Sequence, residues 1–207
     1  MTSEATVFVV DDNVSVCQSL RELLESAGLA VETYQSSEEF LAVYDPARAG
    51  CLVLDVRLRH GKNGLDLQDE LRRRKAMLPI IVLTGHGNVP TSVRALKAGA
   101  IDFLQKPAPP KVLLERIRAA LEIDGQARAT ATQREDVIGQ LAHLTPRERE
   151  VMELLLDGKA SKEIADALRL SVRTVEGHRR MVFMKMNVSS ATQLVRIVMN
   201  AREPHPR

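Results

Sequence analysis

Short apolar runs alternate with amphipathic stretches through the first part of the chain. Runs of four or five apolar residues are typical of buried strands, and apolar residues repeating at helical spacing predict helices. The predicted strands cover roughly residues 6–10, 30–34, 51–54, 79–84 and 102–106. The predicted helices cover residues 14–27, 36–44, 64–75, 89–98 and 110–122. This alternation predicts an α/β domain, in which a five-stranded parallel sheet is covered by helices on both faces.

The pattern becomes purely helical towards the C-terminus. Thr145-Pro146-Arg147-Glu148 has the composition of a capping box with proline at the first helical position, so a helix is expected to begin there. Further helices are predicted to begin near Ser161, Val172 and Ala191. The tight turn between the second and third of these helices indicates a small all-α helix-turn-helix domain.

A polar segment separates the two patterns. The sequence DGQARATATQRE, residues 124–135, lacks a strong hydrophobic period, and its Ala and Gln content is compatible with a helix. We therefore expect an α/β domain over residues 1–123, a linker with helical potential over 124–142, and the helix-turn-helix domain over 143–207.

Charge divides the chain in the same way. The net charge of +2 hides 15 basic and 17 acidic residues up to residue 124, against 14 and 10 after it. A basic second domain favours a nucleic-acid partner. No apolar run approaches the roughly 18 residues of a membrane span, and the N-terminus lacks a signal-peptide pattern, so a cytoplasmic protein without membrane attachment is expected. Cys17 and Cys51 are expected to be buried thiols.

Polar residues follow four of the predicted strands. Asp11 and Asp12 follow the first, Asp55 follows the third, Thr84 ends the fourth, and Lys106 ends the fifth. The carboxyl ends of parallel strands meet at one edge of the sheet, where such folds place their sites. We therefore expect these five side chains to form one site.

The composition of this cluster indicates phosphoryl transfer. Neighbouring carboxylates repel one another, and Mg²⁺, which prefers oxygen ligands, relieves that repulsion. A bound Mg²⁺ would bring in a phosphoryl donor, and Asp55 would accept the group. Lys106 and Thr84 would contact the phosphoryl oxygens. An alternative in which each polar residue only caps its strand explains one such residue better than it explains four strand ends together.

The third helix of the second domain carries the candidate DNA contacts. Its basic and hydroxyl side chains, Arg173, Thr174, Arg179, Arg180 and Lys185, are suited to phosphates and base edges in the major groove. Glu176 is suited to accept a hydrogen bond from cytosine, although an outward carboxylate that is simply solvated explains it equally well.

Several motifs resemble known families. The segments Val9-Val10-Asp11-Asp12, Leu54-Asp55-Val56-Arg57, Leu83-Thr84-Gly85, Lys97-Ala98-Gly99-Ala100 and Phe103-Leu104-Gln105-Lys106-Pro107 resemble a response-regulator receiver domain, which has the flavodoxin-like fold of CheY. Residues 143–200 resemble a LuxR/FixJ-type DNA-binding domain through Leu144–Val151, Lys162–Ala165 and Ser171–His178. The two sets, in this order, resemble two-component transcription regulators of the FixJ type.

The resemblance implies roles for individual residues. It makes Asp55 the phosphoacceptor, and it makes Asp11, Asp12, Asp55 and the Arg57 carbonyl the Mg²⁺ ligands. Thr84 and Lys106 become phosphoryl sensors, Phe103 becomes a switch residue, and the Lys106–Pro107 peptide becomes cis. Glu176 and Gly177 stand where base-reading residues occur in the family.

The resemblance also implies partners. A sensor histidine kinase would phosphorylate the protein, which would then form a homodimer, bind promoter DNA and engage RNA polymerase to regulate transcription. An enzymatic activity is not expected. A phosphatase with an aspartyl-phosphate intermediate typically shows Asp-x-Asp followed by Thr after the first strand, whereas here the acids are adjacent and Asn13 follows. A DNA-binding protein gated by a small ligand is disfavoured by the alternating first domain and the few aromatic residues.

Two features depart from the family pattern. The loop Leu58–Asn63 lacks the usual Pro and is one residue longer, and Ala108-Pro109-Pro110 stands where Phe and an acid are usual. The first difference is expected to affect phosphorylation and dephosphorylation rates rather than the identity of the acceptor. His60 and His86 lie in predicted loops, and His86 is a candidate for tuning the access of water to the phosphoryl group.

Overall fold

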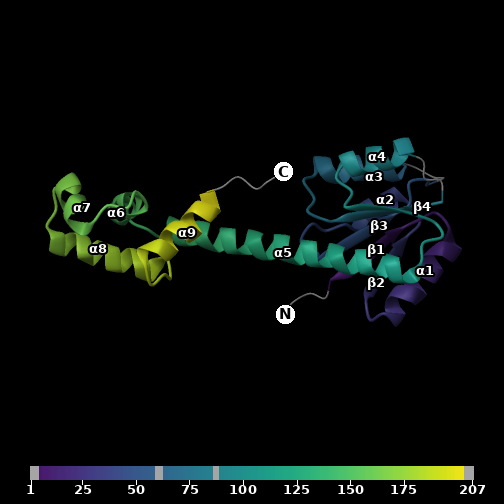
Figure 1. The fold of residues 1–207 in the computed structure, drawn as a ribbon, viewed down its shortest axis with the longest axis horizontal. Coiled ribbons are helices and arrows are strands. Elements are labelled where there is room, and N and C mark those ends of the chain that lie inside the picture. The colour runs from purple at the N-terminus through teal and green to yellow at the C-terminus, as the bar shows by residue number, and fades with distance from the viewer. Residues whose placement is uncertain (1–4, 59–62, 86–88, 203–207) are drawn as a thin grey trace. The chain divides into compact units, whose positions relative to one another are not determined.

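Five parallel strands form one sheet in the first part of the chain. The structure, a computed structural model, describes residues 5–58, 63–85 and 89–202. The strands are β1 (Thr6–Val10), β2 (Ala30–Tyr34), β3 (Gly50–Leu54), β4 (Ile80–Thr84) and β5 (Asp102–Gln105). They lie in the order β2-β1-β3-β4-β5, and every neighbouring pair is parallel (Figure 1). The predicted α/β fold is confirmed.

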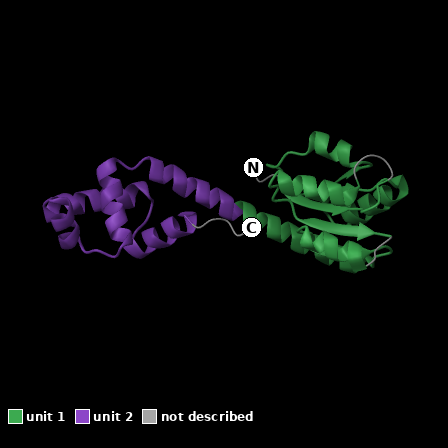
Figure 2. Ribbon diagram, turned by 90° about the horizontal axis from the view of Figure 1, so that it is seen from above, with its two compact units in different colours: residues 1–128 green, residues 129–207 purple. Residues whose placement is uncertain are grey.

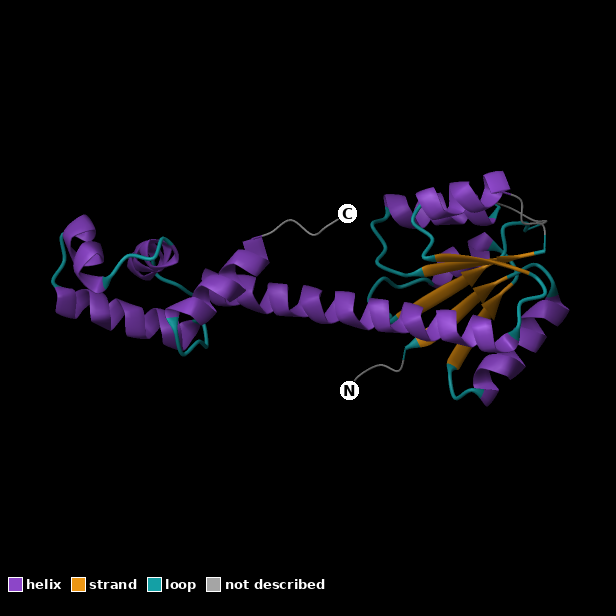
Figure 3. Ribbon diagram, viewed as in Figure 1, coloured by secondary structure: helices purple, strands orange, loops and turns teal. Residues whose placement is uncertain are grey.

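Helices connect the strands and cover both faces of the sheet (Figure 3). They are α1 (Val14–Ser26), α2 (Ser37–Val43), α3 (Gly64–Arg73), α4 (Val89–Lys97) and the first part of α5 (Pro110–Ala142). Three of them begin at a polar residue whose side chain accepts hydrogen bonds from the first-turn amides, namely Asn13, Ser36 and Asn63. These caps satisfy amides that have no partner within the helix.

Successive strand residues pack on opposite faces of the sheet. Phe8 and Leu52 point into one apolar cluster, together with Phe40 of α2 and Leu67 of α3. Their neighbours along the strands, such as Val7, Val9 and Val53, point into a second cluster with Leu24 of α1 and Ile117 of α5. Burial on both faces accounts for the nearly continuous apolar runs of the central strands.

The chain forms two compact units, residues 1–128 and 129–207 (Figure 2). Helix α5 contains the predicted linker segment 124–142, of which residues 124–128 belong to the first unit and 129–142 to the second. Val137 and Leu141 pack against the apolar cluster of the second unit. Each part of the segment thus has packing partners of its own.

A buried carboxylate holds residues 124–128 in the first unit. Asp124 is 1% exposed, and its Oδ2 accepts the Gly50 amide at 2.9 Å and the Arg128 Nε at 2.8 Å. The Arg128 guanidinium also donates to the carbonyls of Pro46, Ala47 and Arg48. One arginine therefore donates to three loop carbonyls and pairs with the buried acid. Burial of a carboxylate without such a partner would be unfavourable.

Four short helices and the end of α5 build the second unit. They are α6 (Pro146–Leu156), α7 (Ser161–Leu168), α8 (Val172–Lys185) and α9 (Ala191–Arg202). Thr145 and Glu148 form the predicted capping box at the start of α6. Arg169, in the left-handed region at φ 53°, ends α7, and Ser171 caps α8. The tight turn expected between these two helices is therefore present, and the all-α second domain is confirmed.

Candidate functional site

The ends of β1 and β3 bring two carboxylates together. The Asp55 amide donates to the Val10 carbonyl at 2.9 Å, which places Asp55 beside the end of β1. Asp11 is 2% exposed and Asp55 is 9% exposed. The Asp11 carboxylate also accepts the Asn13 amide at 2.9 Å, and the Asp55 carboxylate accepts the Arg57 amide at 3.0 Å. The carboxylates are therefore fixed by the backbone that follows each strand.

The Lys106 ammonium lies between these carboxylates. Its Nζ donates to Asp55 Oδ2 at 2.7 Å and also to Asp11 Oδ2. The Lys106 amide donates to the Thr84 carbonyl at 2.9 Å, so the ends of β4 and β5 are joined next to the acids. Thr84 is fully buried. The Lys106–Pro107 peptide is cis, as the resemblance implied.

Burial and pairing act against each other in this cluster. Burial raises the pKa of Asp11 above its ordinary value, and the hydrogen bonds from Lys106 and the Asn13 amide reduce that rise only in part. Burial also disfavours the charged form of Lys106, but its hydrogen bonds to Asp11 and Asp55 outweigh this effect and raise its pKa. The ammonium therefore keeps its charge, which partly neutralises the two acids.

The remaining residues expected at this site lie around the cluster. Asp12 is partly exposed and follows Asp11 directly, while Arg57 is exposed beyond the end of β3. Phe103 of β5 is partly buried and packs against the same apolar cluster as Phe8. His60 and His86 lie outside the described residues, as does most of the unusual loop after Leu58.

The chemistry of the cluster suits Mg²⁺. Among the residues that the structure describes, no group of three or more His, Cys, Asp or Glu side chains is arranged as a metal site. Mg²⁺ does not require such a group, because it keeps several waters and binds through one or two carboxylates together with phosphate oxygens. Asp11 and Asp55 supply two carboxylates that already share one cation, so the donor set present fits this metal.

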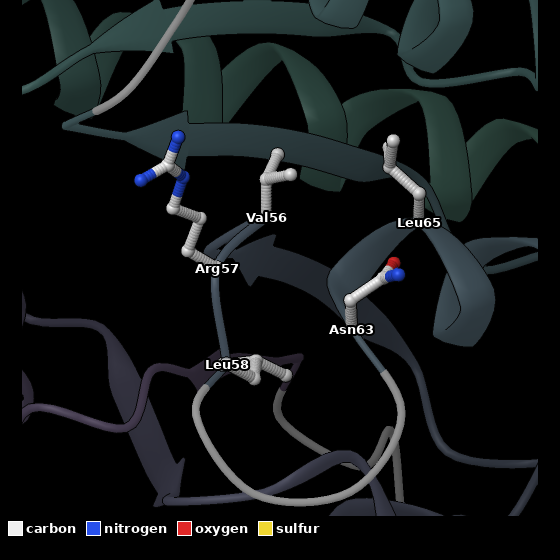
Figure 4. Close-up of a pocket in the computed structure, with 5 residues that line it drawn as sticks. All are labelled: Val56, Arg57, Leu58, Asn63 and Leu65. Atoms are coloured by element: carbon white, nitrogen blue, oxygen red, sulfur yellow. The ribbon is translucent and has the colours of Figure 1, made fainter.

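A cavity of about 400 Å³ lies beside the segment that follows Asp55 (Figure 4). Val56, Arg57, Leu58, Asn63 and Leu65 line it, so it is bounded by the end of β3 and the start of α3. Asn63 also accepts the Asp66 amide at 3.0 Å and thereby begins α3. The cavity is mainly apolar near Leu58 and Leu65, and Arg57 supplies its positive charge.

The predicted DNA-contacting residues all lie on α8, where they differ in exposure. Arg173, Thr174, Glu176, Gly177 and Arg180 are exposed, whereas Arg179 and Lys185 are only partly exposed. Val175 and Val182 are buried and hold the opposite side of the helix in the core. The helix thus presents one charged and polar face at helical spacing.

Lys185 faces the core side of this helix rather than its polar face. Its Nζ donates to Glu148 Oε2 at 2.7 Å and to the His143 carbonyl at 3.2 Å. Glu148 is 5% exposed, and the hydrogen bond from Lys185 lowers its pKa. Lys185 therefore compensates a buried charge within the second unit.

Replacing Lys185 with Met is expected to lower the free energy of unfolding of the second unit by about 2 kcal/mol, because Glu148 would keep its burial without its cation. The loss should be full above pH 4.5, the ordinary pKa of Glu148, because Glu148 is ionised there in both folded and unfolded states. It should shrink as the pH falls through the lowered pKa. Urea unfolding of the full chain at several pH values measures this difference in the free energy of unfolding.

Arg147→Met, at an exposed pair with Glu150, is the matched control and should change stability by less than about 0.5 kcal/mol. Equal effects of the two substitutions would contradict the assignment.

Comparisons with known proteins match both units. The profile described as "Response regulator receiver domain" matches residues 7–118, and that described as "Bacterial regulatory proteins, luxR family" matches residues 142–198. The transcriptional regulatory protein FixJ of Azorhizobium caulinodans is 42% identical over 201 residues, which cover 97% of this chain and 95% of that protein. The chain belongs to the response regulators.

Other relatives of this response regulator support the same family assignment. The response regulator protein TodT of Pseudomonas putida is 38% identical over 193 residues, covering 93% of this chain and 85% of that protein. The solved structure of the response regulator StyR has a TM-score of 0.86 at 40% identity, covering 95% of this chain and 98% of the other. The solved structure of full-length FixJ from B. japonicum has a TM-score of 0.60 at 37% identity, covering 97% of this chain and 98% of the other. The predicted FixJ-type family, with a receiver and a LuxR-type DNA-binding domain, is confirmed.

Three residues with clear structural roles were not predicted from the sequence of this response regulator. Asp124 and Arg128 have the spacing of a helical ion pair, but their loop partners lie about 80 residues away. Ser161 begins α7 and contacts α8, and its sequence position indicated only a helix start.

In the described part of the chain, no helix is both long and apolar enough to span a membrane.

Proposed function

We propose that a sensor histidine kinase phosphorylates this response regulator on Asp55, and that the phosphorylated protein dimerises and binds promoter DNA to regulate transcription. The observation that carries the proposal is the Lys106 ammonium held between Asp55 and Asp11 at the strand ends. This arrangement places a nucleophilic carboxylate next to a fixed cation, at the sheet edge that ligands reach.

The phosphoryl transfer follows from the positions of these groups. An Asp55 carboxylate oxygen forms the new bond to phosphorus while the bond from phosphorus to the donor nitrogen of the kinase histidine breaks. Mg²⁺, held by Asp11, Asp12, Asp55 and the Arg57 carbonyl, would neutralise charge on the phosphoryl oxygens. Lys106 exchanges its contact with Asp55 for one with a phosphoryl oxygen, and the Arg57 amide keeps the acceptor carboxylate oriented.

The same contacts connect the proposed phosphorylation site to the protein surface. Thr84 shares a backbone hydrogen bond with Lys106, and its hydroxyl would donate to the phosphoryl group. Movement of Thr84 would make room for Phe103 and shift α4, which begins five residues later. Helix α4 exposes Val89, Val93 and Leu96 at 76%, 43% and 48%. Such an apolar row suits a partner surface, and a second copy of the receiver is the proposed partner.

Phosphorylation is expected to shift the protein from monomer to dimer, and Leu96→Arg should prevent the shift because it places a charge in the proposed apolar interface. Sedimentation velocity with and without acetyl phosphate and Mg²⁺ measures the change. Val43→Arg, at a side chain 53% exposed on α2, is the matched control and should dimerise normally. A phosphorylated Leu96→Arg protein that dimerises like the wild type would exclude this face.

The second unit supplies the DNA contacts in this proposal. Helix α8 would enter the major groove with Arg173, Thr174, Glu176, Gly177 and Arg180 on its exposed face. A dimer would place two such helices on paired half-sites, and contact with RNA polymerase would turn binding into regulation. The bacterial cytoplasm, where the chromosome lies, is the proposed location. Binding to promoter fragments that rises on phosphorylation tests the proposal, and unchanged binding would contradict it.

A further inference from the structure

A hydroxyl group of α7 links two charged side chains of α8. Ser161 Oγ donates to Glu176 Oε1 and accepts a hydrogen bond from Arg179 Nη1. Arg179 Nη1 also lies 3.5 Å from Glu176 Oε1. The three side chains, which we call the Ser161 clasp, therefore form a closed network across the helix-turn-helix.

Arg179 differs in this respect from its neighbour Arg180. The Arg179 side chain is 26% exposed, and its guanidinium lies 6.0 Å from the centre of the Phe183 ring. Arg180 is exposed and, within the described part of the chain, makes no ion pair. Two adjacent arginines thus have different surroundings: one is held by its own domain, and the other remains available to a phosphate.

Glu176 requires such a neighbour if α8 lies in a DNA groove. Its side chain is 53% exposed, on the same face as Arg173 and Arg180. A carboxylate brought near two rows of phosphates is repelled by them, and an adjacent guanidinium reduces that repulsion. A fixed carboxylate in the major groove accepts a hydrogen bond from the cytosine 4-amino group, whereas it repels the acceptor atoms of guanine.

We propose that the Ser161 clasp is a specificity device, in which Ser161 and Arg179 position Glu176 to select cytosine at one place in the DNA site. This inference rests on the proposed DNA-binding function. Arg179 is a positioning residue in this scheme, and Arg180 is the phosphate contact. Only one of the clasp's carboxylate oxygens is engaged by Ser161, so the other is available to the base.

The test is selection of bound duplexes from a randomised library by full-length protein treated with acetyl phosphate and Mg²⁺. Wild-type protein should select a site with cytosine at one position in each half-site. Glu176→Gln should change that preference towards adenine, because an amide both donates to and accepts from the adenine edge. Ser161→Ala and Arg179→Met should each reduce the cytosine preference by roughly fivefold to tenfold, and Ser161→Thr, which keeps the hydroxyl group, should restore it.

Salt dependence separates positioning from phosphate contact. On the wild-type site, Arg180→Ala should reduce the salt-dependence slope by about one and leave the base preference unchanged, whereas Arg179→Met should leave the slope nearly unchanged. Circular dichroism confirms that each variant is folded. A wild-type preference retained by Ser161→Ala and Arg179→Met, or a slope reduced equally by both arginine variants, would overturn the inference. Absence of any selected sequence with wild-type protein would instead contradict the DNA-binding function.

Discussion

Replacing Asp55 with Asn is expected to abolish phosphorylation. The amide oxygen is a much weaker nucleophile than a carboxylate, while the Asn side chain keeps the oxygen that accepts the Arg57 amide. The local fold should therefore be retained, whereas phosphoryl transfer to this side chain should be lost. Intact-protein mass after incubation with acetyl phosphate and Mg²⁺ measures the result: wild-type protein should gain the mass of one phosphate and the variant none.

Asp69→Asn supplies the control for this substitution. Asp69 is partly exposed on α3, where it faces Arg94, and its loss should leave the phosphorylation of Asp55 unchanged. A phosphate on the Asp55→Asn protein would show that another residue is the acceptor. Inorganic phosphate in solution is assayed in parallel, and its steady release without a stable adduct on the wild type would instead favour the phosphatase alternative.

Gly64→Ala is expected to lower both the stability of the receiver and its rate of phosphorylation. A Cβ atom at Gly64 would lie 2.0 Å from the Asp55 carbonyl oxygen and 3.0 Å from the Val56 Cα. Backbone must move to relieve such contacts, and that backbone carries Asp55, the proposed phosphoacceptor. We expect a loss of about 3 kcal/mol in the free energy of unfolding and a phosphorylation rate at least roughly tenfold lower.

Gly125→Ala is the matched control for this steric effect. A Cβ atom at Gly125 in α5 would have no neighbour within 4 Å, so alanine should raise helix stability by about 0.5–1 kcal/mol and leave phosphorylation unchanged. Urea unfolding and the time course of mass gain measure both variants. A Gly64→Ala protein with wild-type stability and rate would mean that the Asp55 backbone tolerates displacement, contrary to the packing described.

The acids and Lys106 could be assigned to one site from the sequence because the reason for their proximity is topological. Strands in a parallel sheet end at a common edge, so Asp11, Asp55 and Lys106 had to be neighbours although Lys106 is 95 residues from Asp11. The sequence did not determine which atom lies between the carboxylates. That depends on how far a flexible lysine side chain reaches, and the structure places its ammonium there.

Local hydrogen bonds were also determined by the sequence itself. The capping box of Thr145 and Glu148 and the Ser171 cap need only residues three positions apart. Such contacts form whenever the helix forms, because the partners are brought together by the helix geometry alone. The start of each of these helices was therefore predictable.

Only the tertiary structure decided the roles of the long charged side chains. The sequence indicated the same role, on a predicted DNA-facing helix, for three basic residues: Arg179, Arg180 and Lys185. It did not distinguish them, because a long side chain can reach more than one neighbour. The positions of α6 and α7 direct Lys185 to Glu148 and Arg179 to Ser161, and leave Arg180 exposed. The Asp124–Arg128 pair follows the same rule: its spacing is local, but its loop carbonyl partners are set by the folding of distant segments. Local sequence thus determined the elements and the edge at which the site forms, while packing between elements selected the partner of each charge.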